Sequence, residues 1–261
     1  MSAKPNSIIA AAEAEGLWSL YGLKSPSELI LEDVAMAQGI VVMDGPLDSA
    51  LARLIRSGDT GIVRINDRIR LPGQRRFAIA HEIGHWRLHE KMAHLLACTD
   101  EDMLASAHGN VLEAEASIFA SALLMPEFLF TERAGGRLPT TSTIKELANY
   151  FGTSITAAAI RYVETASDYC VFVLSENNRI RWWRASNSFG DHQLWIDNRT
   201  MLPRTSPAAS FFRGEEVPAK PQHVDLNQWL GDLPNIQADI VIEQAIPLSS
   251  YKQVISLLWL P

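Results

Sequence analysis

Three residues of the chain have the types and spacing of a site for metal-dependent hydrolysis. His81, Glu82 and His85 form an HExxH motif in a stretch of helical character. On an α-helix, residues four apart lie about 40° apart around the axis and roughly 6 Å apart along it, so both imidazoles can reach one metal ion. Two neutral imidazoles suit zinc, which in catalytic sites has three protein ligands and a fourth position for water. Glu82, on the adjoining edge of the same face, is placed to act as the general base that takes a proton from that water.

Two histidines four residues apart also arise by chance on core and surface helices, and three features favour a metal site here. Gly84 costs roughly 1 kcal/mol relative to alanine inside a helix, and close approach of another segment between the two histidines would explain it. A candidate third ligand follows downstream. Flanking apolar residues would bury the helix, and they are Ala78, Ile79, Ile83, Trp86 and Leu88.

The third ligand is expected from a second helix. Apolar residues recur at helical spacing from residue 112 to 125, and Pro126 ends the pattern. Glu113 and Glu115 lie near its start, and a carboxylate from a second helix packed against the first completes a His-His-Glu zinc site. We rank Glu113 first, and place Glu115 or another histidine behind it.

The other histidines near the motif are weaker candidates. A histidine ten residues after His81 would complete a three-histidine site, but that position is Lys91. His89 lies one turn beyond the motif, where ligation would stretch the geometry, so we expect it to support the site from outside or to end the helix. His94 and His108 are candidates from loops.

Residues 77–89 and 113–126 together resemble the ImmA/IrrE family of zinc metallo-endopeptidases. The pattern of this family is an AHExGHxxxH helix followed by an E-x-x-A-[ND]-x-F-A-x-x-L-L-M-P helix. Both motifs occur here, in that order.

The resemblance implies that His81, His85 and Glu113 bind zinc and that Glu82 is the base. Ser117 departs from the pattern, because the family usually has Asn or Asp at this position. A serine that supports a metal ligand would do so more weakly, which concerns the level of activity and not the place of the site.

The resemblance also implies a function. Family members typically cleave or otherwise inactivate a helix-turn-helix repressor, which derepresses a mobile element or a stress or DNA-damage regulon, and some belong to toxin–antitoxin-like pairs. We therefore expect a regulatory zinc endopeptidase whose substrate is a helix-turn-helix repressor.

Two other functions remain open from the sequence. The chain could be a non-proteolytic regulator or toxin–antitoxin component that sequesters a repressor, with a structural zinc site. It could also be a DNA-binding regulator that acts through residues 144–163. The residue that stabilises the oxyanion is not identified by the sequence, and His108 and Tyr150 are only candidates.

The pattern of elements predicts an α+β fold in three modules. Residues 1–138 should form a zincin-like metallopeptidase domain with a small mixed sheet ahead of the motif helix, which starts at about residue 75. An edge strand of this sheet could align an extended peptide across the metal. The expected helices are 7–23 and 29–38, and the expected strands are 39–43, 51–55, 61–65 and 69–71.

Residues 139–166 should form a helix-turn-helix-like segment with its turn at 152–154. DNA reading requires polar side chains at the start of the second helix. This helix offers Thr156 followed by three alanines, and Arg161 is its only basic residue. We therefore expect a structural or protein-docking role, and direct DNA binding is not expected.

Residues 167–261 should form a C-terminal α+β accessory domain. A hairpin turns at Asn177 and Asn178, and strands at 240–246 and 254–259 form a closing antiparallel pair. Some family members carry a ligand-sensing domain of the GAF type at this place, which is an analogy of position alone. Its tryptophans could line a sensor pocket, although an aromatic core is the commoner explanation: Trp182, Trp183, Trp195, Trp229 and Trp259.

Composition sets the remaining bounds. The 261 residues are 47% hydrophobic and 20% charged, which is ordinary for globular proteins, and the net charge of −7 argues against a protein that coats nucleic acid. Cys98 and Cys170 are the only cysteines, so neither a disulfide framework nor a cysteine-rich zinc site is expected. Glu13 and Glu15 interrupt a signal-peptide-like run, and no stretch approaches the ~20 apolar residues of a membrane span. We expect a cytoplasmic protein with no membrane partner.

Overall fold

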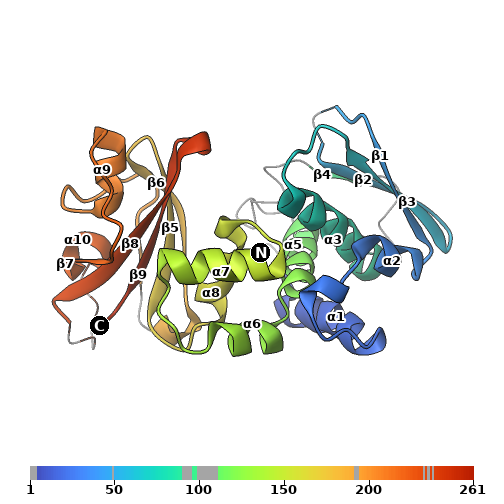
Figure 1. Ribbon diagram of the computed structural model, residues 1–261, viewed down its shortest axis with the longest axis horizontal. Coiled ribbons are helices and arrows are strands. Elements are labelled where there is room, and N and C mark those ends of the chain that lie inside the picture. The colour runs from blue at the N-terminus through green and yellow to red at the C-terminus, as the bar shows by residue number, and fades with distance from the viewer. Residues whose placement is uncertain are drawn as a thin grey trace. The chain divides into compact units, whose positions relative to one another are not determined.

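The computed structural model describes residues 5–48, 50–89, 96–98, 111–190, 194–231, 233, 236 and 238–261, with the backbone alone at 96–98. The fold is α+β, as predicted (Figure 1). The chain divides into two compact units, one of Met1–Phe130 with Ala148–Ser154 and one of Thr131–Leu147 with Ile155–Pro261. The bounds of the three predicted modules stay predictions.

The first unit combines helices with a mixed sheet. The sheet has the strand order β1-β3-β2-β4, in which β1 pairs parallel with β3 while β2 pairs antiparallel with both β3 and β4. Its elements are α1 (Ser7–Leu20), α2 (Leu31–Met36), β1 (Ile40–Gly45), β2 (Ala52–Ser57), β3 (Thr60–Asn66), α3 (Pro72–Leu88), β4 (Leu96–Cys98), α5 (Val111–Leu124) and the start of α6 (Glu127–Ala134).

The motif helix α3 begins earlier than predicted. Pro72 occupies its first turn, where the missing N–H of proline costs nothing. The strand predicted at 69–71 is wrong, because Ile69 donates its N–H to the Asn66 carbonyl in a turn and Leu71 precedes the helix directly. Every residue of α3 from Ala78 to Trp86 is buried, so the helix runs through the core of this unit.

The second unit contains the predicted helix pair and an antiparallel sheet. Helix α7 spans Thr141–Phe151, with its last turn assigned to the first unit, and α8 spans Ile155–Thr165. The sheet has the order β6-β5-β9-β8-β7. Its elements are β5 (Cys170–Glu176), β6 (Arg179–Ala185), α9 (Pro207–Arg213), β7 (Gln222–Asp225), α10 (Leu226–Leu230), β8 (Ile240–Leu248) and β9 (Gln253–Trp259).

The predicted turns are present in both places. Asn177 and Asn178 join β5 to β6 with φ of 52° and 58°, in the left-handed region that tight hairpin turns require. Gly152, with φ of 63°, ends α7 before the second helix of the pair. The short elements β4, α6 and β7 were not predicted.

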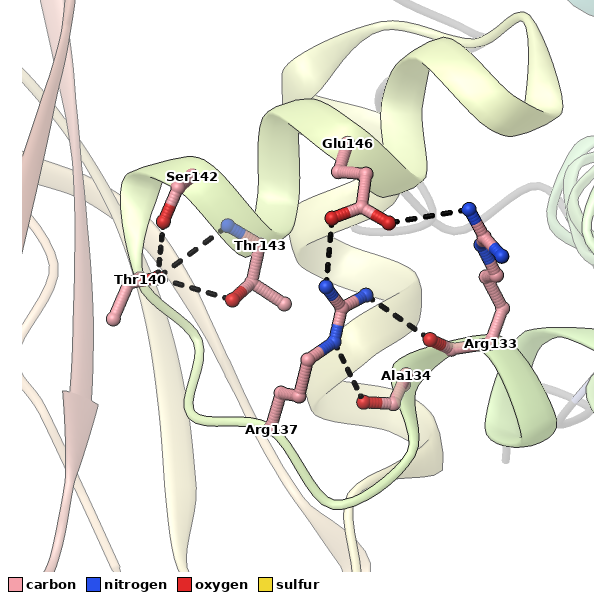
Figure 2. A network of polar contacts seen from close by, with 7 residues as sticks. All are labelled: Arg133, Ala134, Arg137, Thr140, Ser142, Thr143 and Glu146. Atoms are coloured by element: carbon pink, nitrogen blue, oxygen red, sulfur yellow. Dashed lines mark hydrogen bonds and ion pairs between the residues drawn. The ribbon is translucent and has the colours of Figure 1, made fainter.

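Polar contacts order the connection from α6 to α7 (Figure 2). Arg137 donates to the Glu146 carboxylate at 2.7 Å, and Arg133 donates to the other oxygen of the same carboxylate at 3.2 Å. Thr140 precedes the helix, and its hydroxyl accepts the N–H of Thr143 at 3.3 Å. These ion pairs are exposed and contribute little stability, but they define the path of the chain into α7.

The predicted tryptophans are not one cluster. Trp229 and Trp259 belong to the core with 4% and 5% of their surface exposed, whereas Trp195 is 73% exposed. Aromatic core therefore explains two of them, and a ligand for this part of the chain stays a prediction. No single helix among the described residues is long and apolar enough to cross a membrane.

A buried carboxylate connects several elements of the second unit. Glu243 on β8 is fully buried, and its Oε1 accepts from the Ser206 hydroxyl at 2.8 Å, the Ser256 hydroxyl at 2.9 Å and the Ala208 N–H at 3.2 Å. Its Oε2 accepts from the Trp229 indole at 2.8 Å. Burial raises the pKa of Glu243, and these hydrogen bonds oppose the rise without cancelling it. One side chain thus holds α9, α10 and β9 to β8.

Substitution of Glu243 should destabilise the second unit in a graded way. Glu243→Ala removes the acceptor of four donors and leaves a cavity, so we expect a loss of about 3 kcal/mol or more. Glu243→Gln keeps the volume but turns an amide N–H toward one of the donors, so we expect a loss of about 1–3 kcal/mol. Urea unfolding measures both.

Exposed Glu215 in the same unit provides the control, because Glu215→Gln should leave the urea midpoint unchanged. The pH dependence has a definite sign. Since the folded pKa of Glu243 lies above the ordinary value of 4.5, the advantage of the wild type over Glu243→Gln should shrink as pH rises above about 4.5. An advantage that grows with pH would contradict the raised pKa.

Candidate metal centre

The two helices that carry the predicted ligands bring them together. His81 and His85 on α3 are fully buried, and Glu113 on α5 is 6% exposed. The His81 Nε2 atom lies 3.1 Å from Glu113 Oε2 and 3.1 Å from His85 Nε2, and His85 Nε2 lies 3.4 Å from Glu113 Oε1. Donors at 2.0–2.1 Å around one tetrahedral ion stand about 3.3 Å from one another. The three side chains therefore fit a metal ion and could hold one.

Close packing of α3 against α5 makes these distances possible, and the helices lie side by side (Figure 1). A Cβ atom at Gly84 would lie 3.2 Å from both the Cα and the carbonyl oxygen of Ala116, and 3.1 Å from the Phe119 ring. The expectation that another segment approaches Gly84 is therefore confirmed. Backbone of α5 occupies the space that a larger residue would need.

The electrostatics of the cluster suit metal binding. Burial alone would raise the pKa of Glu113, but contacts with His81 and His85 outweigh it and hold the pKa well below its usual range. Burial lowers the pKa of His85, against the opposing effect of Glu113. An ionised carboxylate beside neutral imidazole is the protonation state in which these groups bind a metal.

Glu82 lies inside the same unit, as the base must. It follows His81 on α3 and is fully buried. A carboxylate in that position is shielded from bulk solvent and adjoins the ligand face of the helix. Its role as the general base stays a prediction.

The remaining candidate ligands are His89, Glu115, His94 and His108. The His89 Nδ1 atom lies 3.0 Å from Nδ1 of His85, and its Nε2 lies 3.0 Å from Glu115 Oε2. His89 thus contacts the candidate ligand His85 from outside the cluster, and Glu115 contacts His89. His94 and His108 lie outside the described residues.

Ser117, which departs from the family pattern, lies beside the candidate ligand His81. Its hydroxyl oxygen lies 3.4 Å from Nδ1 of His81. The contact is long for a hydrogen bond to a hydroxyl, so it supports the imidazole weakly. Tyr150 packs edge-on against Phe151 with ring centroids 4.9 Å apart, and its suggested role at the oxyanion stays a prediction.

Sequence reasoning missed the link between His89 and Glu115. Burial lowers the pKa of His89, which Glu115 opposes, while the backbone of Asn6 and the His89 ring hold the pKa of Glu115 below its usual range against the effect of burial. The four-residue step from His85 to His89 was the available signal, because it repeats the spacing of the motif.

Residues 35–162 match the family model Peptidase_M78, described as the IrrE N-terminal-like domain. No curated protein sequence matches the chain significantly. A solved structure described as a Mycobacterium tuberculosis transcriptional regulator is similar in fold, with a TM-score of 0.58 and 14% sequence identity over 96% of this chain and 75% of that one.

Gly84→Ala should destabilise the first unit although alanine is the better helix former. The added methyl group gains roughly 1 kcal/mol in helix propensity, but it would lie 3.2 Å from backbone atoms of α5, which would have to shift to accommodate it. Overpacking of this kind costs about 1–3 kcal/mol, so we expect a net loss and weaker zinc binding because α5 carries Glu113 away from the histidines. Urea unfolding and zinc titration measure the two effects.

Gly16 provides the matched control within α1, because nothing lies within 4 Å of its added Cβ. Gly16→Ala should therefore stabilise the protein by up to about 1 kcal/mol. Equal stabilisation by both substitutions would show that the contact at Gly84 is not limiting.

Proposed function

The chain belongs, over residues 35–162, to the ImmA/IrrE family with its IrrE N-terminal-like domain, and on this basis we propose that it is a zinc-dependent endopeptidase that cleaves a helix-turn-helix transcriptional repressor. Cleavage would derepress a mobile-element, stress or toxin–antitoxin-type operon in the cytoplasm. The observation that carries the proposal is the convergence of three buried ligand atoms at the separations of one tetrahedral ion.

The residues of the site have separate tasks in the proposed reaction. A zinc ion held by His81, His85 and Glu113 would polarise the scissile carbonyl and lower the pKa of a water molecule. Glu82 takes a proton from the attacking water and then delivers it to the leaving amine. Complete burial of Glu82 keeps this proton transfer away from bulk solvent.

The sheet beside α3 offers a place for an extended substrate. Among the described residues, β1 and β4 are the edge strands of this sheet. An extended peptide can add to such an edge through main-chain hydrogen bonds, which are independent of its side chains. Specificity for one repressor would then come from contacts away from the scissile bond.

A regulatory role without direct DNA reading agrees with the position of α8. The second helix of the pair packs on β5 and β6 of its own unit and buries Ala158, Ala159, Arg161 and Val163. Arg161, the basic residue that could contact DNA, is 7% exposed. The helix therefore supports the C-terminal sheet, and the repressor, not the operator, is the proposed partner.

Glu82→Gln should abolish cleavage and spare both the fold and zinc binding, because it removes the base and keeps the three ligands. We would co-express the wild type or Glu82→Gln with helix-turn-helix repressors from the same genome, beginning with any encoded beside the gene. Intact mass spectrometry then detects fragments and gives the cut site.

Glu132→Gln, an exposed substitution on α6, should cleave like the wild type. Fragments that appear with the wild type and with Glu132→Gln, but not with Glu82→Gln, would support the proposed protease. A stable, uncut complex with wild type and Glu82→Gln alike would instead favour a sequestering protein with a structural metal.

The purified protein should give no sequence-specific mobility shift with the operator of its repressor. The physical reason is that the second helix of the pair buries Arg161, its basic residue, together with Ala158 and Ala159. Titration at two salt concentrations separates weak electrostatic contact, which salt abolishes, from specific recognition. A salt-resistant complex restricted to one site would contradict the docking role of residues 144–163.

A further inference from the structure

A continuous series of polar contacts runs from the candidate ligand His85 to the start of α1. Nδ1 of His85 contacts Nδ1 of His89 at 3.0 Å, and Nε2 of His89 contacts Oε2 of Glu115 at 3.0 Å. The other oxygen of Glu115 accepts the backbone N–H of Asn6 at 2.8 Å. Asn6 in turn caps α1 through its side chain, which accepts the N–H of Ile9 at 3.2 Å.

The positions of the hydrogens along this series follow from the Glu115 carboxylate, which can only accept. The ionised Glu115 carboxylate can only accept, so Nε2 of His89 must carry a hydrogen toward it. A neutral His89 then has a lone pair on Nδ1, which accepts a hydrogen from Nδ1 of His85. His85 is left with its lone pair on Nε2, the atom that faces His81 and Glu113.

Among the described residues, the other histidine of the cluster, His81, has no equivalent support. Nδ1 of His81 is 3.4 Å from the Ser117 hydroxyl, and a hydroxyl can both donate and accept, so this contact fixes no tautomer. His89, by contrast, is 5% exposed and the side chain of Glu115 is 17% exposed, which keeps competing water away from the contact. Control of the ligand tautomer is therefore concentrated on His85.

We propose that His89 and Glu115 are positioning residues which hold His85 in the Nδ1–H tautomer with Nε2 directed at the metal, and that the start of α1 keeps Glu115 in place. This proposal rests on the proposed function, because it concerns a metal held by His81, His85 and Glu113. His89 also ends α3 by donating its backbone N–H to the His85 carbonyl, so a purely structural role must be distinguished from the positioning role.

The test is a double-mutant cycle on zinc affinity. The full-length protein is stripped with a chelator and titrated with zinc against a chromophoric competitor, for wild type, Glu115→Ala, His89→Phe and the double variant. Loss of an outer partner of a ligating histidine typically weakens metal binding 10- to 100-fold, so each single variant should fall by that factor. The double variant should bind no more weakly than His89→Phe alone, because Glu115 acts through His89.

Glu15→Ala is the matched control. The Glu15 carboxylate also accepts a backbone N–H across the fold, that of Glu127 at 2.7 Å. This substitution should therefore change zinc affinity by less than about twofold, well below the factor expected at an outer partner. Thermal unfolding of each metal-free variant shows whether it is folded. If Glu115→Ala or His89→Phe is unfolded, Glu115→Gln takes its place in the test. This substitution keeps the size of the side chain and an acceptor oxygen, so it should weaken zinc binding to a smaller extent.

The outcomes test the proposed function and the positioning role of His89 and Glu115 separately. A wild type that takes up no zinc would end the proposed function itself. A wild type that binds zinc while Glu115→Gln and the single variants bind it equally well would overturn the positioning role and leave the metal site intact. Losses that add in the double variant would also overturn it, because two independent structural effects add whereas two members of one series do not.

Discussion

The close contact between α3 and α5 is the constraint on which the candidate metal centre depends. Gly84 lies between the two histidines of α3, and the backbone of Ala116 on α5 fills the space that any side chain there would take. That approach places Glu113, one turn before Ala116, within 3.4 Å of both imidazoles. Burial of these polar groups carries a cost, and a cation at their centre would offset it. Gly84 thus lowers the helix propensity of α3 but allows the Glu113 carboxylate on α5 to approach the two histidines.

Local sequence signals predicted the elements that are long or periodic. The four-residue spacing of the histidines specified a shared helix face, and on β3 the apolar Val63 and Ile65 are buried on either side of exposed Arg64. Short elements were missed because their stability comes from distant partners. In the described residues, strand β4 pairs with β2, and β7 pairs with β8. The strand expected at 69–71 was wrong since turn formation and a proline at the start of α3 outweighed the apolar character of these residues.

The ligands could be predicted from sequence and their supports could not, for a geometric reason. His81 and His85 share one helix, so their relation is fixed by helix geometry alone. The contact between His89 and Glu115 depends on how α3 and α5 are rotated against each other, and it joins positions 26 apart in the chain. The contact between Asn6 and Glu115 joins positions 109 apart. Nothing in the composition of these stretches specifies such pairs, and Glu115 falls at a position that the family pattern leaves free.

Two buried carboxylates of this chain show why burial alone does not identify a functional site. The oxygens of Glu243 are surrounded by donors, namely two serine hydroxyls, an indole and a backbone N–H, and burial raises its pKa. Glu113 faces two imidazoles whose Nε2 atoms are 3.1 Å apart, and these contacts lower its pKa. Donors around Glu243 complete its hydrogen bonding, so that cluster is satisfied by the protein itself. At Glu113, atoms of three residues that could each bind a metal lie within 4.8 Å of one another, and their lone pairs would repel unless a proton or a cation lies between them. The chemistry of the partners therefore fits a structural role for Glu243 and a metal-binding cluster at Glu113.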